Sequence, residues 1–164
     1  MTRVALVPGV LAQLPEYAGI EDPVAELRAA CLNAVGWLGA EVTVLAEGQG
    51  ARVAAHLLAG TTRAGDEPSY LVVGNGSACR TEKAPGHFDE RATAFDADLG
   101  RRLKDANADA LAALDRELAR ELWADVDAIV EMAALGHLSL VDVDYDDDPY
   151  GVQYWVLRWA SRIP

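Results

Sequence analysis

Residues 69–96 read SYLVVGNGSACRTEKAPGHFDERATAFD, a strand pattern that runs into a glycine turn and then into a polar loop. The segment from Tyr70 to Gly74 is apolar and rich in β-branched residues, which predicts a buried strand. Open α/β sheets build their sites outside the carboxyl ends of such strands, so the loop after the turn is the first candidate site. Its chemically capable side chains are Ser77, Cys79, Arg80, Glu82, Lys83 and His87.

Strand and helix patterns alternate on the N-terminal side of this stretch. Arg3–Val7 and Glu41–Ala46 have strand character, and a helical pattern lies between them, beginning at Asp22-Pro23 and ending at Gly39. A shorter helix follows Gly48. The order strand, helix, strand, helix, strand predicts parallel pairing with right-handed crossovers. The expected buried positions of the first helix are Val24, Leu27, Cys31, Ala34 and Leu38.

The C-terminal part is helical for some 45 residues and then extended. Leu138–Tyr145 and Val152–Trp159 read as strands, and the turn Asp148-Pro149-Tyr150-Gly151 joins them into a hairpin. The whole pattern predicts one α/β domain over residues 1–164, with a largely parallel sheet flanked by helices and a C-terminal antiparallel hairpin.

Composition narrows the function classes. The chain has 164 residues, 51% of them hydrophobic and 24% charged, which is typical of one globular domain. No apolar run approaches the roughly 20 residues of a membrane helix. The net charge of −12, with scattered basic residues, argues against nucleic acid as a partner. The N-terminus reads as a strand, and the two cysteines form no obvious pair, so a cytoplasmic location is expected.

The loop GNGSACRTEK matches neither a Walker A loop nor a dinucleotide fingerprint. Its backbone N–H groups, with Arg80 and Lys83, could hold a carboxylate or a phosphate. The alternative is a rigid loop in which Arg80 or Lys83 pairs with Glu82. Cys79 and His87 could also form a thiolate and its base, although such residues are far more often ordinary than catalytic.

The C-terminal strands contain two further patterns. One is a strict alternation of aspartates, Asp142, Asp144, Asp146 and Asp148. A calcium loop beginning at Asp142 would need glycine where Asp147 stands and glutamate where Gln153 stands, so an outward-facing aspartate row is favoured. That alternation places Val141, Val143 and Tyr145 inward. The other pattern is Trp155, Leu157 and Trp159 on one face, explained first by core packing and second by a ligand-stacking wall.

Three segments together resemble a known family: LVPGV (6–10), LVVGNGSACRTEKAPGHFDERATAFD (71–96) and YDDDPYGVQYWV (145–156). They look like bacterial proteins similar to the B-type subunit of class III extradiol ring-cleavage dioxygenases, within the dioxygenase and Memo-like superfamily. The resemblance is most specific over residues 70–104 and 143–159 and covers most of the chain. This chain is shorter than typical members, and the shortening falls between the second strand and Tyr70.

The resemblance implies an iron(II) site held by two histidines and a carboxylate, with another histidine as acid/base. The first ligand of the family lies in a Pro-His-Pro-like turn, which here reads Pro8-Gly9-Val10, and the second belongs to the shortened region. The acid/base histidine follows serine in the family, whereas Ala78 follows Ser77 here. The carboxylate would fall near Asp125. None of His56, His87 and His137 falls at a family ligand position.

The sequence therefore predicts a dioxygenase-like protein without ring-cleavage activity and without a cofactor. It would bind a small anionic molecule or a protein partner at the 74–87 loop, and it could form a homo-oligomer. The alternatives are an iron(II) dioxygenase with displaced ligands, a hydrolase using Cys79 and His87, and a structural subunit that pairs through its last strand. The expected binding residues are Ser77, Arg80, Glu82, Lys83, Asp146, Asp147 and Tyr150.

Overall fold

The computed structural model describes residues 1–10 and 24–161, so the predicted helix start at Asp22-Pro23 lies outside the described residues. Five strands form one mixed sheet in the order β2-β3-β1-β5-β4. The three strands β2, β3 and β1 are parallel, and β5 runs antiparallel to both β1 and β4. The strand bounds are β1 Thr2–Val7, β2 Val42–Leu45, β3 Ser69–Val73, β4 Ser139–Asp147 and β5 Tyr154–Ser161.

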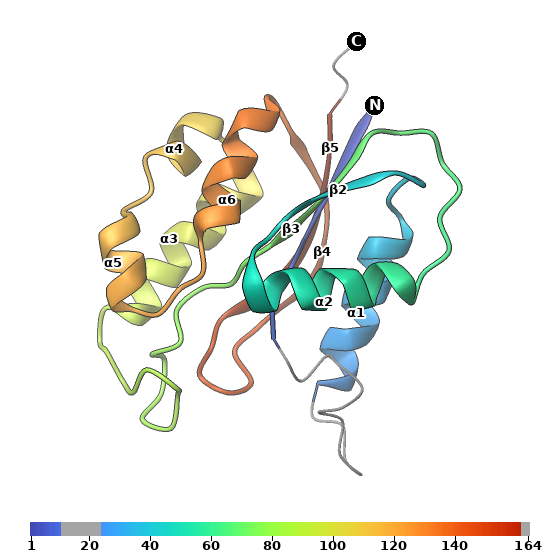
Figure 1. Ribbon diagram of the computed structural model, residues 1–164. Coiled ribbons are helices and arrows are strands. Elements are labelled where there is room, and N and C mark those ends of the chain that lie inside the picture. The colour runs from blue at the N-terminus through green and yellow to red at the C-terminus, as the bar shows by residue number, and fades with distance from the viewer. Residues whose placement is uncertain (11–23, 162–164) are drawn as a thin grey trace.

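Helices cover both faces of this sheet (Figure 1). Two of them, α1 (Ala25–Gly36) and α2 (Gly48–Ala59), pack on the face that carries Ala5 and Val7. The other helices pack on the face that carries Val4 and Leu6. They are α3 Ala92–Asp105, α4 Ala108–Ala112, α5 Arg116–Glu121, α6 Asp127–Met132 and the 3₁₀ helix η3 Ala133–Leu135. The predicted α/β class with a C-terminal hairpin is confirmed.

The crossovers differ from the prediction in one respect. The chain passes from β1 to β2 in one direction along the sheet and returns from β2 to β3 in the other. Both connecting helices nevertheless cover the same face. Two crossovers over one face that run in opposite directions have opposite hands, so one of the two is left-handed. The expectation that both are right-handed is wrong.

The first helix has the predicted buried stripe, since Leu27, Cys31 and Ala34 have no more than 1% of their surface exposed. Its predicted end at Gly39 is wrong, because the helix ends at Gly36. Gly39 is instead required by a close approach, since a Cβ atom at this position would collide with the backbone oxygen of Glu67. Among the described residues, no helix is long and apolar enough to cross a membrane.

The hairpin strand β4 departs from its predicted alternation. Two register shifts interrupt its pairing with β5. As a result Val141 and Val143 are 48% and 37% exposed, so the prediction that they face inward is wrong. The Asp144 side chain, predicted to face outward, is only 9% exposed and lies against Arg158, with 2.7 Å between Oδ2 and Nε. On β5 the predicted tryptophan face is confirmed as core packing, because Trp155 and Trp159 are buried.

Candidate functional site

The glycine turn after β3 is tied to three other parts of the chain. The Gly74 N–H donates to the Val7 carbonyl at 3.0 Å, and Asn75 exchanges two backbone hydrogen bonds with Asp125, which lies before α6. The Gly76 N–H donates to the Gln153 carbonyl, just before β5. A Cβ atom on Gly76 would lie 2.6 Å from Oδ1 of Asp96, so only glycine permits this approach. The turn is therefore a fixed junction of β3 with β1, with the segments before α6 and β5, and with α3.

A buried carboxylate lies at this junction. Asp96, in the first half of α3, is 2% exposed. Its Oδ1 accepts the Ser77 N–H at 2.7 Å, and its Oδ2 accepts the Ser77 hydroxyl at 2.6 Å. The Arg80 guanidinium adds Nη1 at 3.1 Å from Oδ2. A backbone N–H of the loop and Arg80 thus hold a carboxylate, and that carboxylate is the protein's own Asp96. Lys83, the other expected cation, takes no part in this contact.

Arg80 joins two carboxylates. Besides Asp96, its Nε donates to Oδ2 of Asp148, in the turn between β4 and β5, at 2.6 Å. Burial alone would lower the pKa of the Arg80 guanidinium, but the hydrogen bonds and charges of Asp148 and Asp96 raise that pKa above its ordinary value. Arg80 is therefore a permanent cation that connects the loop to α3 and to the hairpin.

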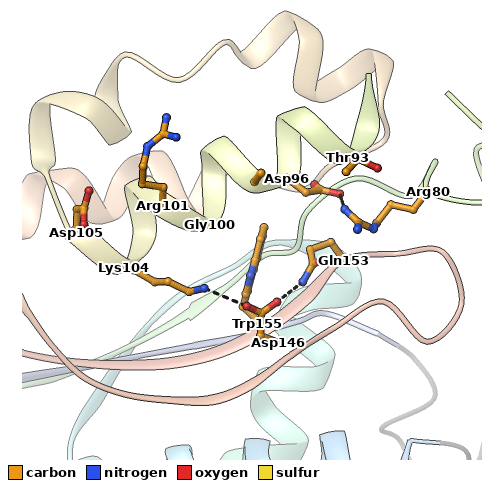
Figure 2. A pocket seen from close by; sticks show the side chains of 11 residues that line it. Arg80, Thr93, Asp96, Gly100, Arg101, Lys104, Asp105, Asp146, Gln153 and Trp155 are labelled. Atoms are coloured by element: carbon orange, nitrogen blue, oxygen red, sulfur yellow. Dashed lines mark hydrogen bonds and ion pairs between the residues drawn. The ribbon is translucent and has the colours of Figure 1, made fainter. Parts of the chain in front are cut away.

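A cavity of about 410 Å³ opens between α3 and the hairpin, with Arg80 in its wall. Figure 2 shows the indole of Trp155 between α3 and the hairpin, with Asp146 below it. Three cations and three carboxylates line the cavity, together with two neutral polar side chains and a short apolar strip. The residues are Arg80, Arg101, Lys104, Asp96, Asp105, Asp146, Thr93, Gln153, Ala97, Gly100 and Trp155.

The Asp146 carboxylate is held by donors from two elements. Its Oδ2 lies 3.0 Å from Nζ of Lys104 on α3, and its Oδ1 accepts Nε2 of Gln153 at 2.8 Å. Gln153 is only 6% exposed, so its amide is a fixed part of the cavity wall. Arg101 pairs with Asp98 outside the cavity. Asp105, by contrast, is an exposed carboxylate at the rim of the cavity.

The two buried tryptophans of β5 differ in their hydrogen bonding. The indole N–H of Trp159 donates to the Leu103 carbonyl at 2.9 Å. Trp155 lines the cavity, and its indole N–H has no acceptor among residues 1–10 and 24–161. The nitrogen itself is not fully enclosed by the protein. Buried indole N–H groups usually find a partner. Trp155, which lines the cavity, therefore has a spare hydrogen-bond donor.

The structure distributes the seven sequence-predicted site residues over three positions. Arg80 and Asp146 line the cavity, and Ser77 lies behind it, bonded to Asp96. Glu82 and Lys83 are exposed and do not line the cavity. Asp147 and Tyr150 are also exposed and outside it, and the Asp147 carboxylate accepts the Asp148 N–H.

The sequence interpretation missed the contribution of α3. Asp96, Gly100 and Lys104 recur every four residues, next to the buried stripe of Phe95, Leu99 and Leu103. This spacing places them on one side of the helix, beside the stripe that packs on the sheet. The glycine in the middle of that row leaves space against the Trp155 ring, since a Cβ there would lie 3.3 Å from Cζ2. The sequence feature that could have indicated this wall is the glycine, Gly100, between the charged residues Asp96 and Lys104 at helical spacing.

Cys79 and His87 do not form a thiolate and its base. The Cys79 thiol is buried and donates to backbone carbonyls of Leu122 and Gly86, at 3.4 and 3.5 Å. Burial raises the pKa of this thiol above its ordinary value, and the charges of Asp89 and Asp96 raise it further. His87 is exposed in a turn with φ of 62°. A hydrolase built on these two residues lacks its activated nucleophile.

A second, smaller cavity of about 160 Å³ lies at the carboxyl ends of β2 and β3. Four carboxylates border it: Glu47, Asp125, Asp127 and Glu131. Burial raises the pKa of Asp125, and the charges of Asp127 and Glu47 raise it further. Within the described part of the chain, no three His, Cys, Asp or Glu side chains are grouped so that they could hold a metal ion.

Comparison with known proteins leaves the family resemblance as an expectation. No protein-family model matches the chain, and a search of curated proteins finds no significant match.

Proposed function

We propose that this protein is a dioxygenase-like scaffold without ring-cleavage activity, which binds a small anionic ligand in the cavity between α3 and the β4–β5 hairpin. One observation carries the proposal. The 74–87 loop supplies Arg80, which holds the carboxylates of Asp96 and Asp148, to a cavity that is also lined by Lys104, which holds Asp146, and by Trp155, whose indole N–H has no acceptor among the described residues. The cavity volume of about 410 Å³ is within the range of small-molecule sites.

The lining suits an anion with an apolar body. Lys104 offers an ammonium group that is half-exposed, and Gln153 offers a buried amide N–H₂. Beside them, Ala97, Gly100 and Trp155 form an apolar strip from two facing elements. A carboxylate with a short hydrocarbon chain satisfies both halves of this lining, because its charged end meets the donors and its chain covers the strip.

The loss of ring cleavage is supported by the residues at the family's histidine positions. Gly9 stands in the turn after β1, where the resemblance places an iron ligand, and Ala78 stands where it places the acid/base histidine. The Ala78 side chain is buried and belongs to the apolar core cluster that also holds Val152 and Tyr154. Neither position offers a nitrogen to a metal or to a substrate proton.

The test is a titration of ¹⁵N-labelled protein with hexanoate, followed through the indole N–H signals of its four tryptophans. Trp155→Phe assigns the Trp155 signal. The expected result is a saturable shift of that signal, with a dissociation constant on the order of 1 mM, as expected for so small a ligand. The exposed Trp123 serves as the internal control. A Trp155 signal that does not move, or that moves only in parallel with Trp123, overturns the proposal.

A further inference from the structure

Two of the carboxylates that line the cavity between α3 and the hairpin accept hydrogen bonds from neighbouring side chains. They differ in how firmly they are held. Asp96 is 2% exposed and accepts three hydrogen bonds, from the N–H and hydroxyl of Ser77 and from Arg80. Removing it from these donors would leave a buried charge without partners. Asp96 is thus a fixed part of the wall.

Asp146 is held far more loosely. The side chains of Lys104 and Asp146 are 40% and 38% exposed, and ion pairs in such positions contribute little to stability. Asp146 is the last residue but one of β4, beside the hairpin turn, so its carboxylate can turn toward water without leaving a buried charge behind. Its displacement therefore costs little.

The donors that hold Asp146 would remain in place after its displacement. Gln153 is nearly fully buried, and its Nε2 also donates to the Tyr154 carbonyl at 3.2 Å. Its backbone N–H is bonded to the Ser77 carbonyl at 3.0 Å, which fixes the residue to the glycine turn. Lys104 projects from α3 on the same side of that helix as Asp96 and Gly100 (Figure 2). Together they form a ready-made carboxylate position.

The charges of the cavity lining decide how strongly the cavity attracts an anion. The lining holds three cations and three carboxylates, and two of the cations, Arg80 and Arg101, also pair with Asp148 and Asp98 just outside it. The cavity therefore has no excess of positive charge while Asp146 is in place. An incoming anion meets no excess of positive charge under these conditions. When the Asp146 carboxylate is neutralised or turned away, one cation, Lys104, is left for the ligand.

We propose that Asp146 is a built-in competitor, whose carboxylate occupies the position of the ligand's carboxylate on Lys104 and Gln153. This inference rests on the proposed function, because it assigns the anion subsite within the same cavity. The ligand class that follows is a monocarboxylate with an apolar chain. Its carboxylate replaces Asp146, and its chain lies along Ala97, Gly100 and Trp155.

The test compares the hexanoate affinity of three proteins: wild type, Asp146→Asn and Asp142→Asn. The two variants remove the same charge from the same strand, but Asp142 pairs with Arg158, which stacks on Trp37 over the opposite face of the sheet. We expect Asp146→Asn to bind hexanoate about three- to tenfold more tightly than wild type, with a gain that shrinks at high salt. Asp142→Asn should bind like wild type. A thermal melt of each variant confirms that it is folded.

The outcomes separate the inference from the proposed function. Wild-type binding with an equal or weaker affinity in Asp146→Asn overturns the competitor role and leaves the proposed function intact. Equal gains in both variants also overturn it, because they reveal only the reduction in overall negative charge. If neither wild type nor Asp146→Asn shifts the Trp155 indole signal, both the inference and the proposed function are overturned.

Discussion

Asp96 shows how one residue changes the meaning of a sequence motif. The glycine turn, Ser77 and Arg80 form the arrangement that the sequence assigns to a bound anion. The acceptor is a residue of α3, 19 positions after Ser77. Spacing along the sequence could not reveal this, because a helical aspartate next to Phe95 has no local feature that marks it as a partner for a distant loop.

The first prediction concerns Arg80, with Lys83 as its matched control from the same loop. Arg80→Ala leaves the buried Asp96 carboxylate without its cation and frees Asp148, so the free energy of unfolding should fall by about 2 kcal/mol. Hexanoate affinity should fall as well. Lys83→Ala, an exposed residue outside the cavity, should change neither quantity. Urea denaturation measures the free energy of unfolding. Equal midpoints for wild type and Arg80→Ala would show that the ion pairs of Arg80 contribute nothing to stability.

The second prediction concerns the two thiols. Cys31 and Cys79 are buried, and burial raises the pKa of both above the ordinary range. Since only the thiolate attacks an alkylating reagent, folded protein at pH 8 should react with iodoacetamide much more slowly than protein in urea. Mass spectrometry counts the modified residues. Rapid modification of Cys79 in the folded protein would contradict this prediction and would support the alternative in which Cys79 acts as a nucleophile.

At the scale of helices and strands, hydrophobic periodicity predicted those elements whose pairing and packing have no irregularity. The parallel strands, the buried stripe of α1 and the tryptophan face of β5 follow from helix and strand periods. Strand β4 is where this reasoning failed, because two register shifts change which side chains share a face. A bulge depends on the pairing with β5, and the sequence of β4 alone does not specify that pairing.

The third prediction tests the ion pairs of that hairpin. Asp144 is 9% exposed and Asp142 59% exposed, and both bind Arg158. Asp144→Asn should lower the free energy of unfolding by about 2 kcal/mol, because it weakens a desolvated pair. Asp142→Asn should stay within about 0.5 kcal/mol of wild type. Chemical denaturation measures the free energy of unfolding of the two variants. Similar losses in both would contradict the claim that burial makes the Asp144 pair the more important one.

At the scale of the whole molecule, the fold class was predictable and the cavity was not. Alternating strand and helix patterns specify the α/β class through local periods. The cavity needs α3, the 74–87 loop and the hairpin to meet, which is a property of tertiary packing. Of the seven residues expected at the site, Arg80 and Asp146 line this cavity, and Trp155 had entered the sequence analysis only as a second explanation of the tryptophan face. Lys104 was not expected there, because its place in the wall depends on how α3 packs against the hairpin.

The fourth prediction concerns metal. After anaerobic incubation with iron(II) and desalting, we expect well below one iron per chain by elemental analysis. The reason is the chemistry of the donors, since Gly9 and Ala78 stand where the family resemblance would place histidines, and neither side chain offers a nitrogen to a metal. Near-stoichiometric iron would favour a dioxygenase with displaced ligands. The acidic cavity around Asp125 and Glu47 would then be the first place to examine.

The most direct test of anion binding compares three six-carbon ligands of different charge: hexanoate, hexanamide, which has nearly the same shape, and hexylamine. Each is titrated into wild-type protein while the Trp155 indole N–H signal is followed. The proposed site on Lys104, Gln153 and Trp155 predicts a saturable shift with hexanoate, a weaker one with hexanamide and none with hexylamine. Preferential binding of hexylamine, or equal binding of all three, would contradict an anion site in this cavity.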